Sequence, residues 1–279
     1  MLAGRVARSI RTLAYRSGLF HPACLPVDGG RWLVRTAQGF PLYCLAADQS
    51  VSPGLALSGI WEPRVTRAFE RCIRSDSDVV VEVGANIGYF TVAMARRIPA
   101  GRYFAFEANP AAFGLLKSNI ALNLLWNVTA EQSLVADRKR SIEFNCLGRH
   151  LGSGSIADFG KDYLDAHADT KTTIVMEAIT LDERLAGTGR VDVLKIDAEG
   201  AEPLILAGAR DLIRNNRNLR IVMELNGPMV ANFEDPQKLV SSLVDQGFEV
   251  FEISHARQPR RIAWREIDAR RQYELMCTR

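Results

Sequence analysis

Apolar, β-branched runs alternate with segments of helical periodicity over much of the chain. The run at 79–83 predicts a buried strand, and a helix is expected after it over 87–97. Similar strands are expected at 102–107, 127–134 and 193–196, with helical segments between them. Alternation of this kind predicts an α/β fold with a mostly parallel sheet and helices on both faces.

The two ends of the chain depart from this alternation. Residues 1–27 hold four arginines and no acid, with apolar residues at helical spacing, which predicts a basic amphipathic helix. Short strands at 31–35 and 40–45 predict a hairpin after it. We therefore expect an N-terminal extension over residues 1–60 and one main domain over 61–279, which closes with strands near 248–253 and 273–277.

Residues 141–179 interrupt the main domain. Strands are expected at 141–146 and 172–179, on either side of a Gly/Ser-rich linker and a short helical piece at 162–167. Long segments carried on a rigid scaffold often determine specificity, so we expect this insertion to face the substrate.

Composition excludes several classes of protein. The 279 residues are 47% hydrophobic and 24% charged, enough for one substantial core. A net charge of +3 without basic–aromatic runs does not indicate nucleic-acid binding. Five scattered cysteines without a C-x-x-C pair favour free thiols in a reducing, cytoplasmic compartment and argue against zinc. No apolar stretch reaches the length of a membrane span.

The basic N-terminus allows three interpretations. It could pack on the domain, make peripheral contact with an anionic membrane, or direct the chain to mitochondria. We favour the first.

The turn after the first strand has the spacing E-x-G-x-N-x-G, formed by Glu82, Gly84, Asn86 and Gly88. A nicotinamide dinucleotide turn requires G-x-G-x-x-G beside a pyrophosphate, and here Asn86 and Tyr89 replace the second and third glycines. A carboxylate before the turn would repel a pyrophosphate but suits a cationic ligand. S-adenosylmethionine carries an ammonium, a sulfonium and no phosphate, so the turn predicts a site for that donor. An ordinary structural strand–turn–helix is the alternative.

Two further acids follow the next strands. Glu107 ends the strand at 102–107, about 20 residues after the glycine turn, where a carboxylate can accept from both ribose hydroxyls. Asp137 follows the strand at 127–134 and is a candidate acceptor for the adenine amine. The basic run 138–140 supports an alternative in which Asp137 is a solvated turn acid.

The strand at 193–196 carries Lys195 and delivers Asp197 and Glu199 to its carboxyl end, where open α/β sheets bind ligands. Methyl transfer is an in-line displacement, and a positioned base helps an alkyl hydroxyl to react. Asp197 and Glu199 are the candidate bases, with Lys195 orienting them. A purely structural ion-pair cluster is the alternative. The pair could also hold a divalent cation, but the sequence offers no third ligand, so no metal is predicted. His255, after a strand, is a weaker candidate base.

These segments resemble the FkbM-type S-adenosylmethionine-dependent methyltransferases. The matching stretches are WEP (61–63), VEVGANIGYFT (81–91), FEANP (106–110), TLDERL (180–185), LKIDAEGAEPLILAGA (194–209) and VMELN (222–226). The chain departs from the family pattern in two places, with Glu82 for the usual Asp and Ala108 for the usual Pro. Trp61 and Glu62 could close over the donor, or be a core aromatic and a surface acid.

The resemblance implies a seven-stranded Rossmann-like sheet, S-adenosylmethionine as donor, and usually O-methylation of a sugar, glycan or natural product. The expected partner is thus a small-molecule or glycan acceptor, and N-methylation remains compatible with the residues. Two other functions also remain open. One is a non-catalytic S-adenosylmethionine-binding regulator, and the other, disfavoured by Asn86 and Tyr89, is a nicotinamide-dependent oxidoreductase.

Overall fold

The computed structural model describes residues 24–157, 164–165, 167–254 and 258–279. Outside these described residues lie residues 1–23 of the expected basic helix, half of the helical piece at 162–167 (162, 163 and 166), and His255. Residues 24–26, which the helix expected over 1–27 included, form a strand instead. None of the helices in the described ranges has the length and apolar character needed to cross a membrane.

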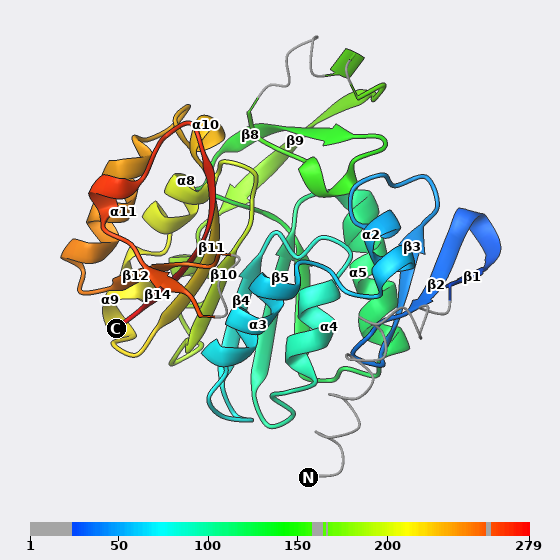
Figure 1. Cartoon of the computed structure of the whole chain (residues 1–279), viewed down its shortest axis with the longest axis horizontal. Helices are drawn as coiled ribbons and strands as arrows, with labels where there is room; N and C mark the ends of the chain where they lie inside the picture. Colours follow the sequence, from blue (N-terminus) through cyan, green and yellow to red (C-terminus); the bar gives the residue numbers. More distant parts are fainter. Residues whose placement is uncertain (1–23, 158–163, 166, 255–257) are drawn as a thin grey trace.

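The helices and strands follow one another along the chain as in Figure 1. The strands are β1 (Cys24–Pro26), β2 (Arg31–Arg35), β3 (Pro41–Leu45), β4 (Val79–Val83), β5 (Arg102–Glu107), β6 (Val128–Gln132), β7 (Leu134–Val135), β8 (Ser141–Leu147), β9 (Lys171–Ile179), β10 (Val193–Ile196), β11 (Arg220–Asn226), β12 (Glu249–Glu252), β13 (Arg260–Arg261) and β14 (Gln272–Thr278). The helices are α2 (Ser52–Ser58), α3 (Pro63–Cys72), α4 (Tyr89–Ala95), α5 (Pro110–Leu122), α7 (Leu181–Arg184), α8 (Glu202–Ala207), α9 (Arg210–Asn215), α10 (Gly227–Val230) and α11 (Pro236–Asp245).

The central sheet has the order β13-β12-β14-β11-β10-β4-β5-β6. β6, β5, β4, β10 and β11 pair in parallel, whereas β14 is antiparallel to both of its neighbours, β11 and β12. The α/β prediction with a mostly parallel sheet is confirmed. The seven expected strands are present, and the two-residue β13 extends the edge beyond β12.

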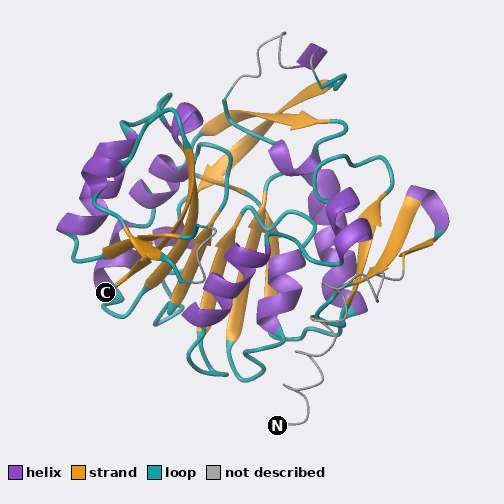
Figure 2. Cartoon of the chain, in the orientation of Figure 1, coloured by secondary structure: helices purple, strands orange, loops and turns teal. Residues whose placement is uncertain are grey.

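Helices cover both faces of this sheet, as predicted (Figure 2). Residues of α3, α4 and α5 pack against one face with Val80, Val193 and Val222, and residues of α7, α8, α9 and α11 pack against the other with Val81 and Leu194. Strands buried on both faces are apolar in nearly every position, which is why β4 and β10 can be recognised from sequence. A charged side chain inside such a strand therefore calls for a specific explanation.

The predicted N-terminal hairpin is confirmed as β2–β3 and is extended by β1 into a three-stranded antiparallel sheet. Asn119 of α5 anchors it, because its Oδ1 accepts from the Tyr43 N–H at 2.6 Å and its Nδ2 donates to the Tyr43 carbonyl at 3.0 Å. This extension therefore packs beside α5, away from the β12–β14 end of the central sheet.

The strand expected at 127–134 is divided between two sheets. β6 ends at Gln132 in the central sheet, and β7 then pairs with β9 in a separate sheet of order β7-β9-β8. The insertion at 141–179 contributes β8 and β9, so its chain begins immediately beside the carboxyl edge of the central sheet.

Candidate functional site

The register of the central sheet aligns polar residues along its carboxyl edge. Lys195 lies opposite Glu82 on one side and Val222 on the other. Because side chains alternate between faces, the residues two positions further on also share a face. This next row, which we call the edge row, contains Glu107, Gly84, Asp197, Glu224 and Glu274; the last two are direct partners between β11 and β14.

The glycine turn is shaped by close backbone contact. Gly84 has φ 81°, and a Cβ atom built there would lie 1.7 Å from the Asp197 carbonyl oxygen. Gly88 has φ 89° and is the N-cap residue directly before α4. This helix runs only from Tyr89 to Ala95 and is shorter at both ends than the helix expected over 87–97. Asn86 also has positive φ, at 50°, a conformation that asparagine tolerates better than most residues.

Glu107 holds this turn from the neighbouring strand. Its Oε2 accepts from the Asn86 N–H at 2.6 Å, and its Oε1 accepts from the Asn109 N–H at 2.7 Å. Burial raises the pKa of Glu107 to about 7, against the effect of these two hydrogen bonds. The residue is 7% exposed and lines a pocket at the carboxyl edge of the sheet, which we call the main pocket. The glycine turn (84–88) lines the same pocket with residues 84–87. The sequence analysis therefore correctly predicted that Glu107 lies beside the glycine turn.

Glu82 is fully buried beneath the pocket and does not line it. Its Oε2 accepts from the Thr91 hydroxyl at 2.6 Å and the Tyr103 hydroxyl at 2.7 Å, while its Oε1 has no partner among the described residues. Burial raises the pKa of Glu82, and the nearby Lys195 opposes that shift. The expected direct contact between Glu82 and the cofactor stays a prediction.

Lys195 connects Glu82 with the edge row. Its side chain is 2% exposed, and its ammonium lies 2.9 Å from Asp197 Oδ2 and 4.6 Å from the Phe90 ring centre. Burial alone would lower the pKa of Lys195, but the charges of Asp197 and Glu82 outweigh burial and raise it. A charged lysine is therefore the stable form here, and it donates a hydrogen bond to Asp197. Its expected role of orienting Asp197 and Glu199 for catalysis stays a prediction.

Asp197 and Glu199 both line the main pocket. The Asp197 side chain is 26% exposed. Glu199 has φ 49°, and its carbonyl accepts from the Ser155 hydroxyl at 2.8 Å, a contact with the insertion. Burial, followed by the charge of Asp197, raises the pKa of Glu199 to about 8. Glu202 fixes the same loop by accepting from the Ala198 N–H at 3.0 Å.

The expectation for Asp137 needs correction. Asp137 is not among the residues that line the pocket, and its carboxylate pairs with Arg140 at 3.0 Å. The chain reaches the pocket earlier, through Ser133, Leu134 and Val135. This difference arises because β6 ends at Gln132 and β7 turns into the second sheet, which carries the chain past the pocket before residue 137. Asp137 is thus a turn acid in an ion pair.

Three glutamates that the sequence did not bring together lie beside Asp197. Oxygens of Glu62, Glu224 and Glu274 all lie within 4.8 Å of one another. Burial, followed by the charge of Asp197, raises the pKa of Glu62 to about 7. Period-two alternation over 273–277 could have placed Glu274 opposite the apolar face of its strand, but it could not identify β11 as the partner.

The residues of the main pocket fit S-adenosylmethionine. Glu107 offers a carboxylate to ribose hydroxyls, and the Asn86 Oδ1 atom is buried without a partner among the described residues. Apolar walls from Leu134, Phe144 and Ile156 suit a purine ring. The acids around the turn disfavour a phosphate. These features match a cationic nucleoside and disfavour a nicotinamide dinucleotide.

Comparison with known proteins supports the same conclusion. The methyltransferase FkbM domain matches residues 82–250. Methyltransferase sdnD of Sordaria araneosa is 27% identical over 199 residues, which cover 61% of this chain and 73% of that protein. Methyltransferase 1 of Beauveria bassiana is 28% identical over 149 residues, covering 49% of this chain and 60% of that protein.

Among solved structures, the methyltransferase FkbM of Methylobacillus flagellatus is similar with a TM-score of 0.46 and 13% identity, over 74% of this chain and 44% of that one. The domain match covers more than half of the chain. The chain belongs to the FkbM family of methyltransferases, whose methyl donor is S-adenosylmethionine.

Proposed function

We propose that this methyltransferase transfers the methyl group to a hydroxyl oxygen of a small-molecule or glycan acceptor. The observation that carries the proposal is the Asp197 carboxylate, which is partly exposed in the pocket that Glu107 and the glycine turn also line. A carboxylate beside the donor pocket is suited to accept a proton from a hydroxyl group.

In the proposed reaction, different residues of the chain have different roles. When bound, S-adenosylmethionine supplies a methyl group on a sulfonium, which is released as a neutral thioether. Glu107 and the Asn86 region would hold the nucleoside. Lys195 donates to Asp197 and fixes its orientation. Asp197 and Glu199, both at the pocket, would bind the acceptor hydroxyl and take its proton.

The position of the insertion (141–179) at the pocket supports a role for this segment in acceptor recognition. Phe144, Leu151, Gly152, Gly154 and Ile156 all line the main pocket. The Ser155 hydroxyl donates to the Glu199 carbonyl, which ties the insertion to one candidate base. The names of the fungal relatives state methyl transfer and give no acceptor, so the acceptor class follows from the chemistry proposed for Asp197 and Glu199.

The test is labelled methyl transfer. The full chain is incubated with extracts and trideuteromethyl-labelled donor, and products are analysed by mass spectrometry for the labelled group and for the atom that carries it. Asp197→Asn combined with Glu199→Gln should lower turnover by about 100-fold or more. Asp211→Asn, an exposed acid of α9 paired with Arg214, is the matched control. Turnover within a few fold of wild type would exclude the two acids as the base.

The two other functions give different results in the same experiment. A regulator would bind the donor in calorimetry but label no product in any extract. An oxidoreductase would bind NAD and not the donor. Label found on nitrogen would retain methyl transfer and reject the hydroxyl acceptor.

A further inference from the structure

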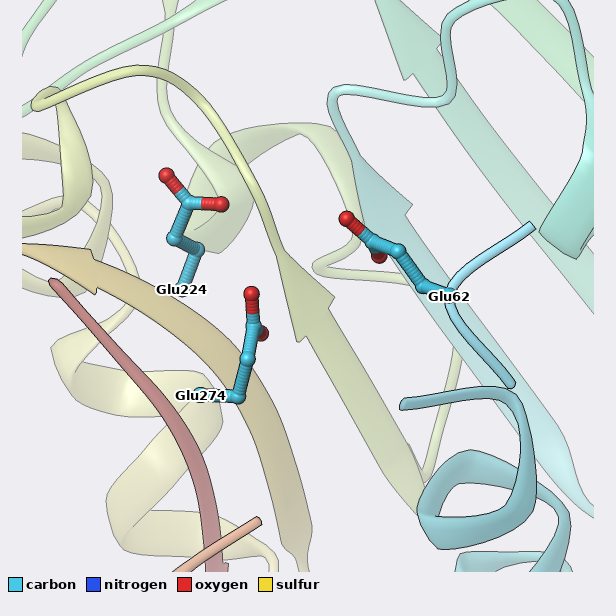
Figure 3. A group of neighbouring side chains, drawn as sticks. All are labelled: Glu62, Glu224 and Glu274. Carbon is cyan, nitrogen blue, oxygen red and sulfur yellow. The ribbon is translucent and has the colours of Figure 1, made fainter. Parts of the chain in front are cut away.

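We propose that Glu62, Glu224 and Glu274 form a binding site for one divalent metal cation. Their oxygens lie within 4.8 Å of one another, and Figure 3 shows the three side chains converging on a shared space. The sequence alone predicted no metal because only Asp197 and Glu199 could be placed together. The third ligand appears only when β14 lies beside β11.

The three ligands come from separate elements. Glu224 and Glu274 are direct partners on the antiparallel strands β11 and β14. Glu62 immediately precedes α3 and reaches them from the other side (Figure 3). Like charges directly opposite each other destabilise a pair of strands. A cation between them would convert this repulsion into attraction.

Glu224 gives an independent reason to expect a ligand. It is 8% exposed, and the side-chain hydrogen bond that reaches its carboxyl group is shared with Glu274, another acid of the same cluster. Buried carboxylates are normally paired or hydrogen-bonded. Its side chain points toward Glu62 and Glu274, which are also acids (Figure 3). What this group lacks is a positive partner.

The nearest protein cation does not fill that need. Lys195 donates to Asp197 at 2.9 Å and lies over the Phe90 ring. Lys195 forms its ion pair with Asp197 rather than with Glu62, Glu224 or Glu274. The charge of Lys195 also lowers the pKa values of Glu62 and Glu274. This one lysine therefore faces Glu82, Asp197 and the three glutamates, and it offsets only part of their negative charge.

The ligand set defines the class of cation. Carboxylate oxygens select hard cations such as magnesium, manganese and calcium rather than zinc or copper. Calcium–oxygen bonds are about 2.3–2.6 Å long, so opposite ligands lie about 4.6–5.2 Å apart. The 4.8 Å limit on the three oxygens agrees with such a site, in which water or substrate completes the coordination.

The cation would act next to the proposed base. Asp197 and Glu224 are neighbours in the edge row, because Ile196 pairs with Met223 immediately before them. A bound cation with open positions can hold a hydroxyl oxygen and lower its pKa. This role rests on the proposed function, since it assumes a hydroxyl acceptor, whereas cation binding does not.

The test measures binding directly. The full chain is titrated with manganese, and the loss of the free-ion electron paramagnetic resonance signal is recorded, with magnesium and calcium as competitors. We expect one manganese per chain. Glu224→Gln and Glu274→Gln, which keep the side-chain shape, should each weaken binding about tenfold or more. Glu143→Gln, in an exposed part of β8, is the control and should leave it unchanged.

The outcomes of this experiment distinguish failure of the metal site from failure of the proposed function. Equal manganese binding by wild type and both variants, or no binding by wild type, would overturn the site. Circular dichroism and donor titration establish that each variant is folded and still binds S-adenosylmethionine. Manganese binding with the predicted variant effects supports the site even where no hydroxyl acceptor is found. Unchanged methyl transfer after complete chelation would reject the catalytic role alone.

Discussion

Gly84 lies directly against the backbone carbonyl of Asp197, so that a Cβ atom at Gly84 would lie 1.7 Å from that oxygen. The contact joins the turn after β4 to the loop after β10. Two segments more than a hundred residues apart along the sequence are thus held together at the pocket. The geometry of the donor turn and that of the candidate base are therefore coupled through one glycine.

Gly84→Ala should damage both folding and donor binding. The added methyl group must displace the Asp197 backbone, and φ 81° costs a non-glycine residue about 1–3 kcal/mol. We expect a melting temperature lower by about 5 °C or more, measured by thermal denaturation, and a large loss of donor affinity in calorimetry.

The control for that substitution is Gly114→Ala in α5. A Cβ at Gly114 meets nothing within 4 Å, and alanine within a helix is more stable than glycine by about 0.5–1 kcal/mol. Its melting temperature should be unchanged or higher. Equal stability of Gly84→Ala and Gly114→Ala would show that the loop after β10 can shift to accept the added methyl group without a loss of folding stability.

Much of the fold could be predicted because the core strands are continuous apolar runs. β5 and β10 begin and end as expected, and Glu107 and Gly84 belong to short local motifs. Asp137 was misplaced because sequence patterns do not show when a chain leaves one sheet for another. The strand expected at 127–134 is divided into β6 and β7, which belong to two different sheets.

The cluster of Glu62, Glu224 and Glu274 lay beyond prediction for a different reason. Its members are separated by 50 to 212 positions in sequence and meet only through strand order. Nothing local in β14 specifies that it inserts between β11 and β12 in the opposite direction. Short local motifs can be recognised in the sequence, whereas the pairing of distant strands depends on the packing of the whole sheet.

Replacing Tyr103 by Phe should destabilise the protein by removing a donor from buried Glu82. The hydroxyl lies 2.7 Å from Glu82 Oε2, and loss of a hydrogen bond to a buried charge costs about 1–3 kcal/mol. Urea denaturation measures this change. Thr91→Val removes the second donor to the same oxygen, so the double variant should lose more than the sum of the two single losses. Simple additivity would argue that the two hydroxyls stabilise Glu82 independently.

Lys195→Met should be strongly destabilising, since it leaves Asp197 and fully buried Glu82 without their cation. Breaking a buried ion pair by removing one partner costs about 3–5 kcal/mol. The companion variant Lys195→Met with Glu82→Gln removes one of the stranded charges and should recover part of the loss, as measured by urea denaturation at neutral pH. If the double variant is no more stable than the single one, Lys195 does not compensate the charge of Glu82.

Glu107 should make donor binding depend on pH near neutrality. Burial raises its pKa to about 7 from an ordinary value of 4.5, so the folded protein binds this proton more tightly than the unfolded chain. The contribution of this group to folding stability is therefore fully present below about pH 4.5 and is lost as pH rises through about 7.

Donor binding has the opposite dependence on pH, because ribose hydroxyls donate to the ionised carboxylate of Glu107. Calorimetric affinity for S-adenosylmethionine should thus rise between pH 6 and 8 by about tenfold, the change expected when roughly one proton must leave across that range. The ratio of wild-type to Glu107→Gln affinity removes the titration of the donor itself, which both proteins share. A ratio that stays constant across this range would mean that Glu107 does not change its protonation state when the nucleoside binds.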